Sequence, residues 1–197
     1  MLGEHVALEP LLFDHVAELV EAATEDRATY EWTAVPGDAA SMATYVENLL
    51  DLRDRGDAVP FVQRRLADGQ LVGCTRYMDI RSWSGRGVPD EVEIGGTWLA
   101  ASAQRTPINT EAKLLLLTHA FETWGVYRVA LATDARNERS RTAIARIGAS
   151  FEGELRNHRW SFAPGEAGQP RTTALFSILP AEWPAVRLVL QERLRRG

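Results

Sequence analysis

The feature that most constrains the fold is an alternation of strands and helices in the second half of the chain. Residues 91–99 have the pattern of a strand, and residues 111–124 have the periodicity of a helix. Residues 127–133 are an apolar strand of the buried type, and residues 137–147 predict a second helix. Because a strand–helix–strand connection places its two strands parallel in one sheet, the fold must contain a parallel pair.

The segments on either side of this unit favour antiparallel pairing. The turn residues Ala67-Asp68-Gly69 join two strand-like segments into a hairpin, and a loop containing Pro164 and Gly165 joins two more. The hairpin strands are expected at 60–64 with 70–78 and at 151–162 with 171–179, a first strand at 6–10, and further helices at 11–23, 39–53 and 181–195. The sequence therefore predicts one mixed α/β domain over residues 1–197. Its twisted sheet is largely antiparallel, holds a central parallel pair and is flanked by helices.

Composition is that of an ordinary globular protein and excludes one class of partner. The 197 residues are 45 % hydrophobic and 25 % charged, with a formal net charge of −5. An acidic chain does not bind nucleic acid through bulk positive charge. Residues 1–90 hold 8 arginines against 16 acids, a net −8, whereas residues 91–197 hold 14 bases against 11 acids, a net +3. The first half therefore suits a cationic partner and the second half an anionic one.

Further absences narrow the chemistry. Cys74 is the only cysteine, so we expect neither an internal disulfide nor a cysteine-rich metal site, and His5, His15 and His119 lack metal-ligand spacing. The N-terminus lacks a signal-peptide pattern, and no apolar run approaches the ~18 residues of a membrane span. We therefore expect a cytoplasmic protein with no metal and no membrane partner. Lys113 is the only lysine, which we attribute to genome base composition.

The first segment that carries chemistry is residues 104–111. It follows a strand whose paired glycines, Gly95-Gly96, predict a bulge, and it opens an apolar helix. Thr106 suits the N-cap and Pro107 the first helical position, although proline supplies no N–H. Free N–H groups and the positive end of the helix dipole favour phosphate at such a start. A plain strand-to-helix turn is the alternative interpretation.

The second such segment is residues 137–148. Asn137 is a strong N-cap candidate with Ser140 at the third helical position, and Gly148 suits the helix end. Ala143, Ile144 and Ile147 form the apolar face of this predicted helix. One interpretation is a capped helix and nothing more; the other depends on a resemblance.

Both segments resemble motifs of the GNAT N-acyltransferase family. Gln104 and Arg105 match the start of motif A, whereas Pro107 stands where the family usually has glycine and Asn109 replaces a second small residue. The match to motif B is intact. The resemblance implies that the first loop holds the pyrophosphate of acetyl-CoA, or of another acyl-CoA, and that the motif B asparagine, Asn137, contacts the pantetheine arm.

The order of segments resembles one branch in particular, the enzymes that acetylate ribosomal-protein N-termini. Residues 6–11, 93–99, 151–156 and 177–184 look like parts of that branch, so the resemblance covers essentially the whole chain. It implies an acceptor-side half, 1–90, and a CoA-binding half, 91–197, that includes the C-terminal strands and helix. The implied acyl-CoA contacts are Trp98, Leu99, Gln104, Arg105, Thr106, Ile108, Asn109, Thr110, Asn137, Ser140 and Arg141.

Acyl transfer from a thioester to an amine needs a base, donors for the developing oxyanion and an acid. Glu93 is the predicted base and Glu91 the second choice; a glutamate that merely faces solvent is the alternative. Backbone N–H groups over residues 97–99, freed by the bulge, are expected to polarise the thioester carbonyl. No tyrosine follows motif B, so the resemblance implies Ser140 as the acid, with His158 as the other candidate.

The acceptor site is expected to be aromatic, with Tyr30, Trp32 and Trp83 as substrate-binding residues; core packing is the alternative role for these rings. The predicted partner is an amine, either a peptide N-terminus or a small molecule, and a homodimer is left open. Two rival functions also stay open. One is transfer from a different donor such as succinyl-CoA. The other is an acyl-CoA-binding or regulatory protein that lost turnover because of Pro107.

Overall fold

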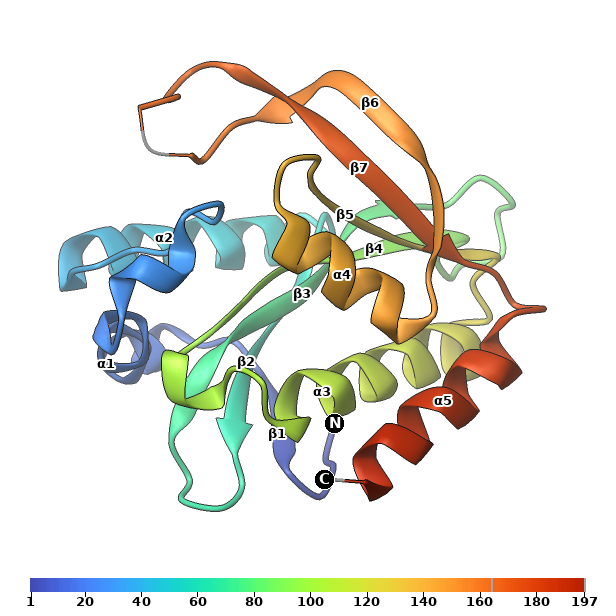
Figure 1. Ribbon diagram of the computed structural model, residues 1–197, viewed down its shortest axis with the longest axis horizontal. Coiled ribbons are helices and arrows are strands. Elements are labelled where there is room, and N and C mark those ends of the chain that lie inside the picture. The colour runs from blue at the N-terminus through green and yellow to red at the C-terminus, as the bar shows by residue number, and fades with distance from the viewer. Residues whose placement is uncertain (164, 197) are drawn as a thin grey trace.

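The residues that the computed structural model describes, 1–163 and 165–196, form a seven-stranded mixed sheet (Figure 1). Its order is β1-β2-β3-β4-β5-β7-β6, and every neighbouring pair is antiparallel except β4 and β5. The predicted mixed sheet with one central parallel pair is confirmed. The strands are β1 (Val6–Pro10), β2 (Val59–Arg65), β3 (Leu71–Arg81), β4 (Glu91–Leu99), β5 (Arg128–Asp134), β6 (Ser150–Trp160) and β7 (Pro170–Ile178).

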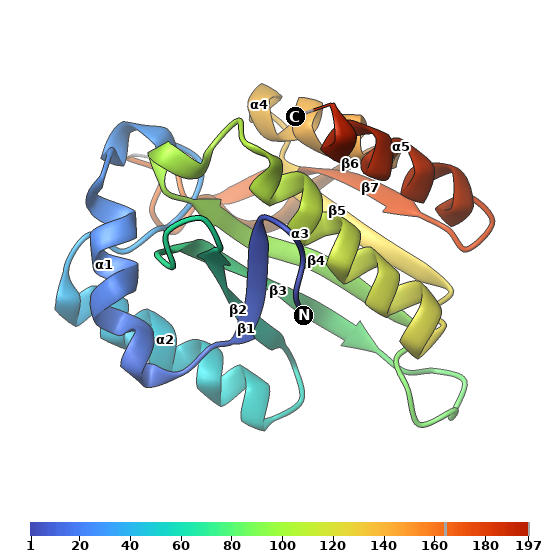
Figure 2. The same cartoon turned by 90° about the horizontal axis from the view of Figure 1, so that it is seen from below.

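Helices cover both faces of this sheet, with α1 and α2 grouped apart from α3, α4 and α5 (Figure 1, Figure 2). They are α1 (Val16–Thr24), α2 (Ala39–Asp54), α3 (Pro107–Thr118), α4 (Glu138–Ile147) and α5 (Trp183–Arg195), with short turns η1 (Phe13–His15), η2 (Arg27–Tyr30), η3 (Ala101–Ala103) and η4 (His119–Trp124). We call the two sheet faces the α2 face and the α3 face. Trp98 of β4 meets Tyr30 edge to face on the α2 face, whereas Tyr77 of β3 donates its hydroxyl hydrogen to the Leu116 carbonyl of α3 at 2.6 Å.

Helix α3 differs at both ends from the helix that periodicity predicts. It begins at Pro107 rather than residue 111, because the Thr106 hydroxyl caps the Ile108 N–H and proline at the first position fits helical geometry. After Thr118 the chain continues as a π-helical turn up to Trp124, where Gly125 in a left-handed conformation ends it. The early start brings the whole segment 104–111 to a helix N-terminus.

The glutamate Glu111, in α3, anchors the N-terminal segment to this helix. Its buried carboxylate accepts hydrogen bonds from the backbone N–H groups of Glu4, His5 and Val6 at 2.7–2.8 Å. This contact fixes β1, and hence the edge of the sheet, relative to α3. It spans more than 100 residues of sequence, so no local pattern signalled it.

The central parallel pair is short, and the two strands then separate. Strands β4 and β5 pair only from Glu91 to Glu93 on β4, against Arg128 to Ala130 on β5. Beyond that point β4 pairs only with β3, and β5 pairs only with β7. The remainder of β4, residues 94–99, therefore borders a wedge between the two strands. The N-termini of α3 and α4 follow the two diverging strands (Figure 1).

A bulge distorts β4 inside this wedge, as its paired glycines predict. Cys74 pairs with Trp98 and Arg76 with Gly95, so two residues of β4 oppose the single residue Thr75 of β3. The extra residue of a bulge has no ladder partner. Since β5 does not pair here either, backbone groups of the bulge face the wedge without a strand partner.

Candidate functional site

The N-terminus of α3 forms the first wall of the site. Thr106 is the N-cap and Pro107 occupies the first helical position, as predicted. Proline removes one donor and the Thr106 hydroxyl accepts the Ile108 N–H, so Asn109 keeps the first-turn N–H group that neither the helix nor the cap uses. Arg105 precedes the cap in a left-handed conformation, with φ of 60°, and its side chain is exposed. This turn can therefore hold an anion through an N–H donor and one cation.

The N-terminus of α4 forms the opposite wall. Asn137 is buried, and its side-chain oxygen accepts the Ser140 N–H at 3.0 Å, so the N-cap prediction is confirmed. The hydroxyl of Ser140 is half-buried on the first turn of α4 and is not required for the cap. Gly148 ends the helix with φ of 104°, as predicted. Capping thus uses Asn137 and leaves the Ser140 hydroxyl available.

The bulge forms the floor of the wedge, and Arg76 lies against it on the α2 face. Gly96 has φ of 56°, and a Cβ there would lie 2.2 Å from Arg76 Nη1, so a larger residue would be strained and would displace the Arg76 guanidinium. Arg76 Nε and Trp98 Nε1 are both buried and have no hydrogen-bond partner within the described residues. Both atoms are covered by neighbouring side chains, and the buried Tyr45 hydroxyl lies against the Arg76 and Trp98 side chains. The donors that the floor of the wedge offers are therefore the backbone N–H groups of the bulge.

Glu93 lies where β4 and β5 part, but its carboxylate is already engaged. Arg159 of β6 grips it with two hydrogen bonds, 2.8 Å to Oε1 and 2.6 Å to Oε2, and also reaches Asp79 Oδ2 at 2.6 Å. The Glu93 side chain is 5 % exposed, so the alternative of a solvent-facing glutamate does not describe it. Glu91, the second choice, pairs with Arg128 at 3.2 Å. Sequence reasoning did not anticipate Arg159.

Two arginines at the start of α4 have different contacts. Arg139 spans the open end of the wedge, with Nη2 donating to the Thr29 carbonyl at 2.5 Å and Nη1 lying 3.5 Å from Gln104 Oε1. Arg141 instead donates to the Ala135 carbonyl and to Glu154 at 2.8 and 2.9 Å. The geometry therefore favours Arg139 over the predicted Arg141 as a cation beside a bound phosphate.

The predicted aromatic residues do not form one group. Tyr30 is buried, packs edge to face on Trp98 at 6.0 Å and donates to the Leu99 carbonyl at 3.1 Å, where Gln104 Nε2 also donates at 3.0 Å. Trp32 is half-buried beneath the Arg136 guanidinium. Trp83 is 59 % exposed in the loop before β4, at the end of the strand opposite the wedge. Tyr30 and Trp32 thus border the site, and Trp83 does not.

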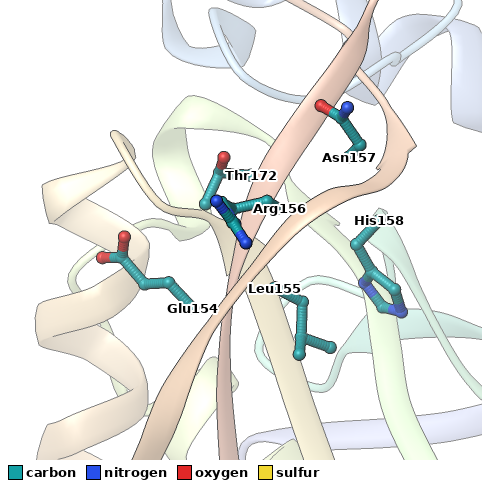
Figure 3. Close-up of a pocket in the computed structure, with 6 residues that line it drawn as sticks. All are labelled: Glu154, Leu155, Arg156, Asn157, His158 and Thr172. Carbon is teal, nitrogen blue, oxygen red and sulfur yellow. The ribbon is translucent and has the colours of Figure 1, made fainter.

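An open surface depression of about 840 Å³ lies along the bulge of β6, in the part of the β6–β7 hairpin nearer its tip (Figure 3). It is lined by Glu154, Leu155, Arg156, Asn157, His158 and Thr172. The labelled side chains point in different directions, and His158 projects away from Glu154. Burial, and then the neighbouring Arg159, lower the pKa of His158. The hairpin tip itself is held by Glu166, which binds Arg136 at 2.7 Å.

One polar group inside the fold was not anticipated as functional. The amine of Lys113, on α3, is buried under the bulge, where its Nζ donates to Thr97 Oγ1 at 2.7 Å and lies 3.5 Å from Thr75 Oγ1. The two hydroxyls are 2.8 Å apart. Burial lowers the pKa of Lys113 to about 7. The sequence signal that could have indicated a buried amine is the position of this single lysine directly before the apolar run Leu114–Leu117.

The described residues contain no cluster of three or more side chains able to hold a metal ion. Within the same ranges, none of the helices combines the length and apolarity that crossing a membrane requires.

Comparison with known proteins gives consistent results. Residues 5–150 match the family model described as acetyltransferase (GNAT) domain. The Bacillus subtilis protein "Putative ribosomal N-acetyltransferase YdaF" is 28 % identical over 187 residues, covering 92 % of this chain and 95 % of that protein. A GCN5-related N-acetyltransferase structure from Brucella melitensis has 30 % identity and a TM-score of 0.83, covering 98 % of this chain and 84 % of that one. An acetyltransferase structure from T. thermophilus, 31 % identical, has a TM-score of 0.81 and covers 98 % of this chain and 96 % of that one.

The family match spans most of the chain and includes both strands of the wedge and both helix N-termini. Members of this family transfer an acetyl group from acetyl-CoA, and the resemblance stated from the sequence is confirmed. This chain belongs to the GNAT family of CoA-dependent N-acetyltransferases.

Proposed function

We propose that the protein acetylates the amino group at the N-terminus of a protein or peptide, using acetyl-CoA. The observation that carries the acyl-transfer part is the wedge, where β4 and β5 part after Glu93 and each is followed by a capped helix N-terminus. The likeness to YdaF, whose name refers to ribosomal N-acetylation, supports a protein acceptor. A cytoplasmic location would follow from such an acceptor.

For the donor, we assign the pyrophosphate to the first turn of α3 and the pantetheine arm to α4. The N–H group of Asn109, with Arg105 and Arg139, would hold the phosphates. Asn137 would orient the pantetheine arm. Pro107 reduces the number of donors by one and leaves the rest of the turn intact. Thr110 on the first turn of α3, with Trp98 and Leu99 at the end of β4, is proposed to complete the contacts to the donor.

For the reaction, acetyl-CoA supplies an activated acyl group, and the chain supplies alignment and proton transfer. Donors of the β4 bulge would polarise the thioester carbonyl. As the C–S bond breaks, the Ser140 hydroxyl would give a proton to the departing sulfur and regain one from the nitrogen, which loses it as the amide forms. Glu93 is proposed to receive the amine proton through water. That role requires Arg159 to shift toward Asp79, which it already contacts at 2.6 Å. The amine, once neutral, attacks directly in a ternary complex.

The acceptor is assigned to the α2 face, which Tyr30 and Trp32 border. The excess of acids over bases in residues 1–90 would attract an ammonium group. A homodimer stays a prediction.

Two measurements test this proposal. Calorimetric titration with acetyl-CoA is expected to show binding, and thiol release is expected to be faster with peptides bearing a free N-terminus than with the same peptides blocked. Faster release with small amines would overturn the protein acceptor, and faster release with succinyl-CoA would overturn the acetyl group. Binding without release for any acceptor would favour an acyl-CoA-binding protein, and no binding would overturn the donor site.

A further inference from the structure

The buried amine of Lys113 is connected to the most irregular part of β4. The bulge sets Gly96 and Thr97 against the single residue Thr75, and the amine contacts the hydroxyls on both strands at this point. The contact therefore joins three elements, α3, β3 and β4, at the place where the wedge begins to widen. Among the described residues, no carboxylate pairs with this amine.

Fold stability gives no reason for a lysine here. Burying an amine without a carboxylate is unfavourable, and an apolar side chain of similar length would pack against the neighbouring leucines without that penalty. Groups that violate the usual packing rules are concentrated at functional sites. The lowered pKa of Lys113 is consistent with this environment, and a neutral amine can both donate to and accept from the two hydroxyls.

We propose that Lys113 is a positioning residue for acyl transfer: through Thr97 and Thr75 it holds the β4 bulge in the conformation that presents its free N–H groups to the thioester carbonyl. This inference rests on the proposed acyl transfer. Lys113 does not touch either reactant; it acts through the Thr97 hydroxyl and the backbone that carries it. Helix α3 supplies both this amine and the phosphate-binding first turn, so the helix links donor binding to the geometry of the bulge.

The test compares Lys113→Met with a matched control, Tyr77→Phe. Lys113→Met removes the buried contacts of the amine with Thr97 and Thr75, whereas Tyr77→Phe removes one buried hydrogen bond between α3 and the sheet that touches neither threonine. Thiol release is measured with acetyl-CoA and the preferred acceptor, and thermal unfolding is followed in parallel. For Lys113→Met, we expect kcat to fall by about 10-fold to 100-fold with KM for acetyl-CoA changed less than about threefold. Its midpoint of unfolding should be equal to that of the wild type or higher.

The Tyr77→Phe control should show the reverse, a lower unfolding midpoint and kcat within about twofold of the wild type. If Lys113→Met fails to fold, Thr97→Val gives the second test, because it removes the hydroxyl and conserves the shape. The double variant Lys113→Met/Thr97→Val should lose no more kcat than either single variant, because each single variant already removes the contact between Lys113 and Thr97.

Wild-type kcat in Lys113→Met or in Thr97→Val would overturn the inference while leaving the proposed function intact. Equal losses of kcat and stability in Lys113→Met and Tyr77→Phe would also overturn it, since the lysine would then be only structural. If the wild-type protein releases no thiol with any amine, the proposed function fails and this inference fails with it.

Discussion

The two faces of β4 handle buried charge in opposite ways. On the α2 face, the Glu93 carboxylate is matched by Arg159, which in turn contacts Asp79. On the α3 face, the Lys113 amine has two hydroxyl partners and burial lowers its pKa to about 7. On the α2 face Glu93 is therefore matched by an opposite charge, whereas the environment on the α3 face favours an uncharged amine.

This difference is consistent with the separate tasks proposed for the two faces. An ion-pair network can exchange partners when a cationic amine arrives, so it suits the acceptor side. The buried Lys113 amine cannot move away from its hydroxyl partners without leaving a cavity. It therefore suits a rigid contact that supports the donor side. Strand β4 contributes residues to both faces. Variants on the α2 face and on the α3 face should therefore change stability and kinetics differently.

The largest expected effect is on the α2 face. Arg159→Met leaves the buried Glu93 carboxylate without its guanidinium and should lower the free energy of unfolding by about 3 kcal/mol. Glu93→Gln keeps the shape and leaves Arg159 paired with Asp79, so it should cost less than half as much. Denaturant unfolding at neutral pH measures both. Equal costs for the two variants would show that the pair is not the dominant contact of Glu93.

The next effect is the pH dependence of stability from the α3 face. Lys113 has an ordinary pKa of 10.5 when the chain is unfolded and a pKa of about 7 when it is folded. Between these values the unfolded chain binds the extra proton, so stability rises with pH. Each pH unit contributes at most about 1.4 kcal/mol, so the wild type should gain about 2 kcal/mol over Lys113→Met from about pH 7 to about pH 8.5. A constant difference between the two would contradict the buried, uncharged amine.

A smaller pair of effects distinguishes capping from chemistry on α4. Asn137→Ala removes the oxygen that accepts the Ser140 N–H and should lower the free energy of unfolding by about 1 kcal/mol, while weakening acetyl-CoA binding. Ser140→Ala leaves this cap in place, so stability should hold while kcat falls more than KM changes. Unfolding curves and thiol-release kinetics measure the two. Unchanged kinetics in both variants would remove α4 from the site.

The smallest effect is expected at the closed end of β4. Trp83 is exposed in the loop before this strand, away from the wedge. Trp83→Ala should change the free energy of unfolding by no more than about 0.5 kcal/mol and leave kcat/KM within about twofold. A large rise in KM for the acceptor would restore the predicted substrate role of this residue.

Much of this fold was predictable because its signals are local. Residues 91–99 alternate as a strand, Asn137 and Gly148 bracket a helix, and the paired glycines predict the bulge. Each of these patterns is contained within one short stretch of sequence. The start of α3 shows the limit of periodicity, because the cap at Thr106 and the proline after it set the boundary instead.

The charge contacts of the site were not predictable in the same way. Glu93 was expected at the site, but its partner Arg159 lies 66 residues away along the chain and its position depends on the β6 bulge. Lys113 and Thr97 lie on different elements, and nothing in either segment indicates that the amine turns inward. Trp83 was grouped with Tyr30 by residue type alone, and the topology sends its loop to the other end of the strand.

The measurement that tests the central claim most directly is diffraction from crystals of this protein grown with CoA. We predict the pantetheine arm between the separated parts of β4 and β5, with the pyrophosphate at the first turn of α3 and Asn137 beside the arm. CoA bound elsewhere, or a wedge filled by the chain's own side chains while CoA is held at another surface, would contradict this prediction.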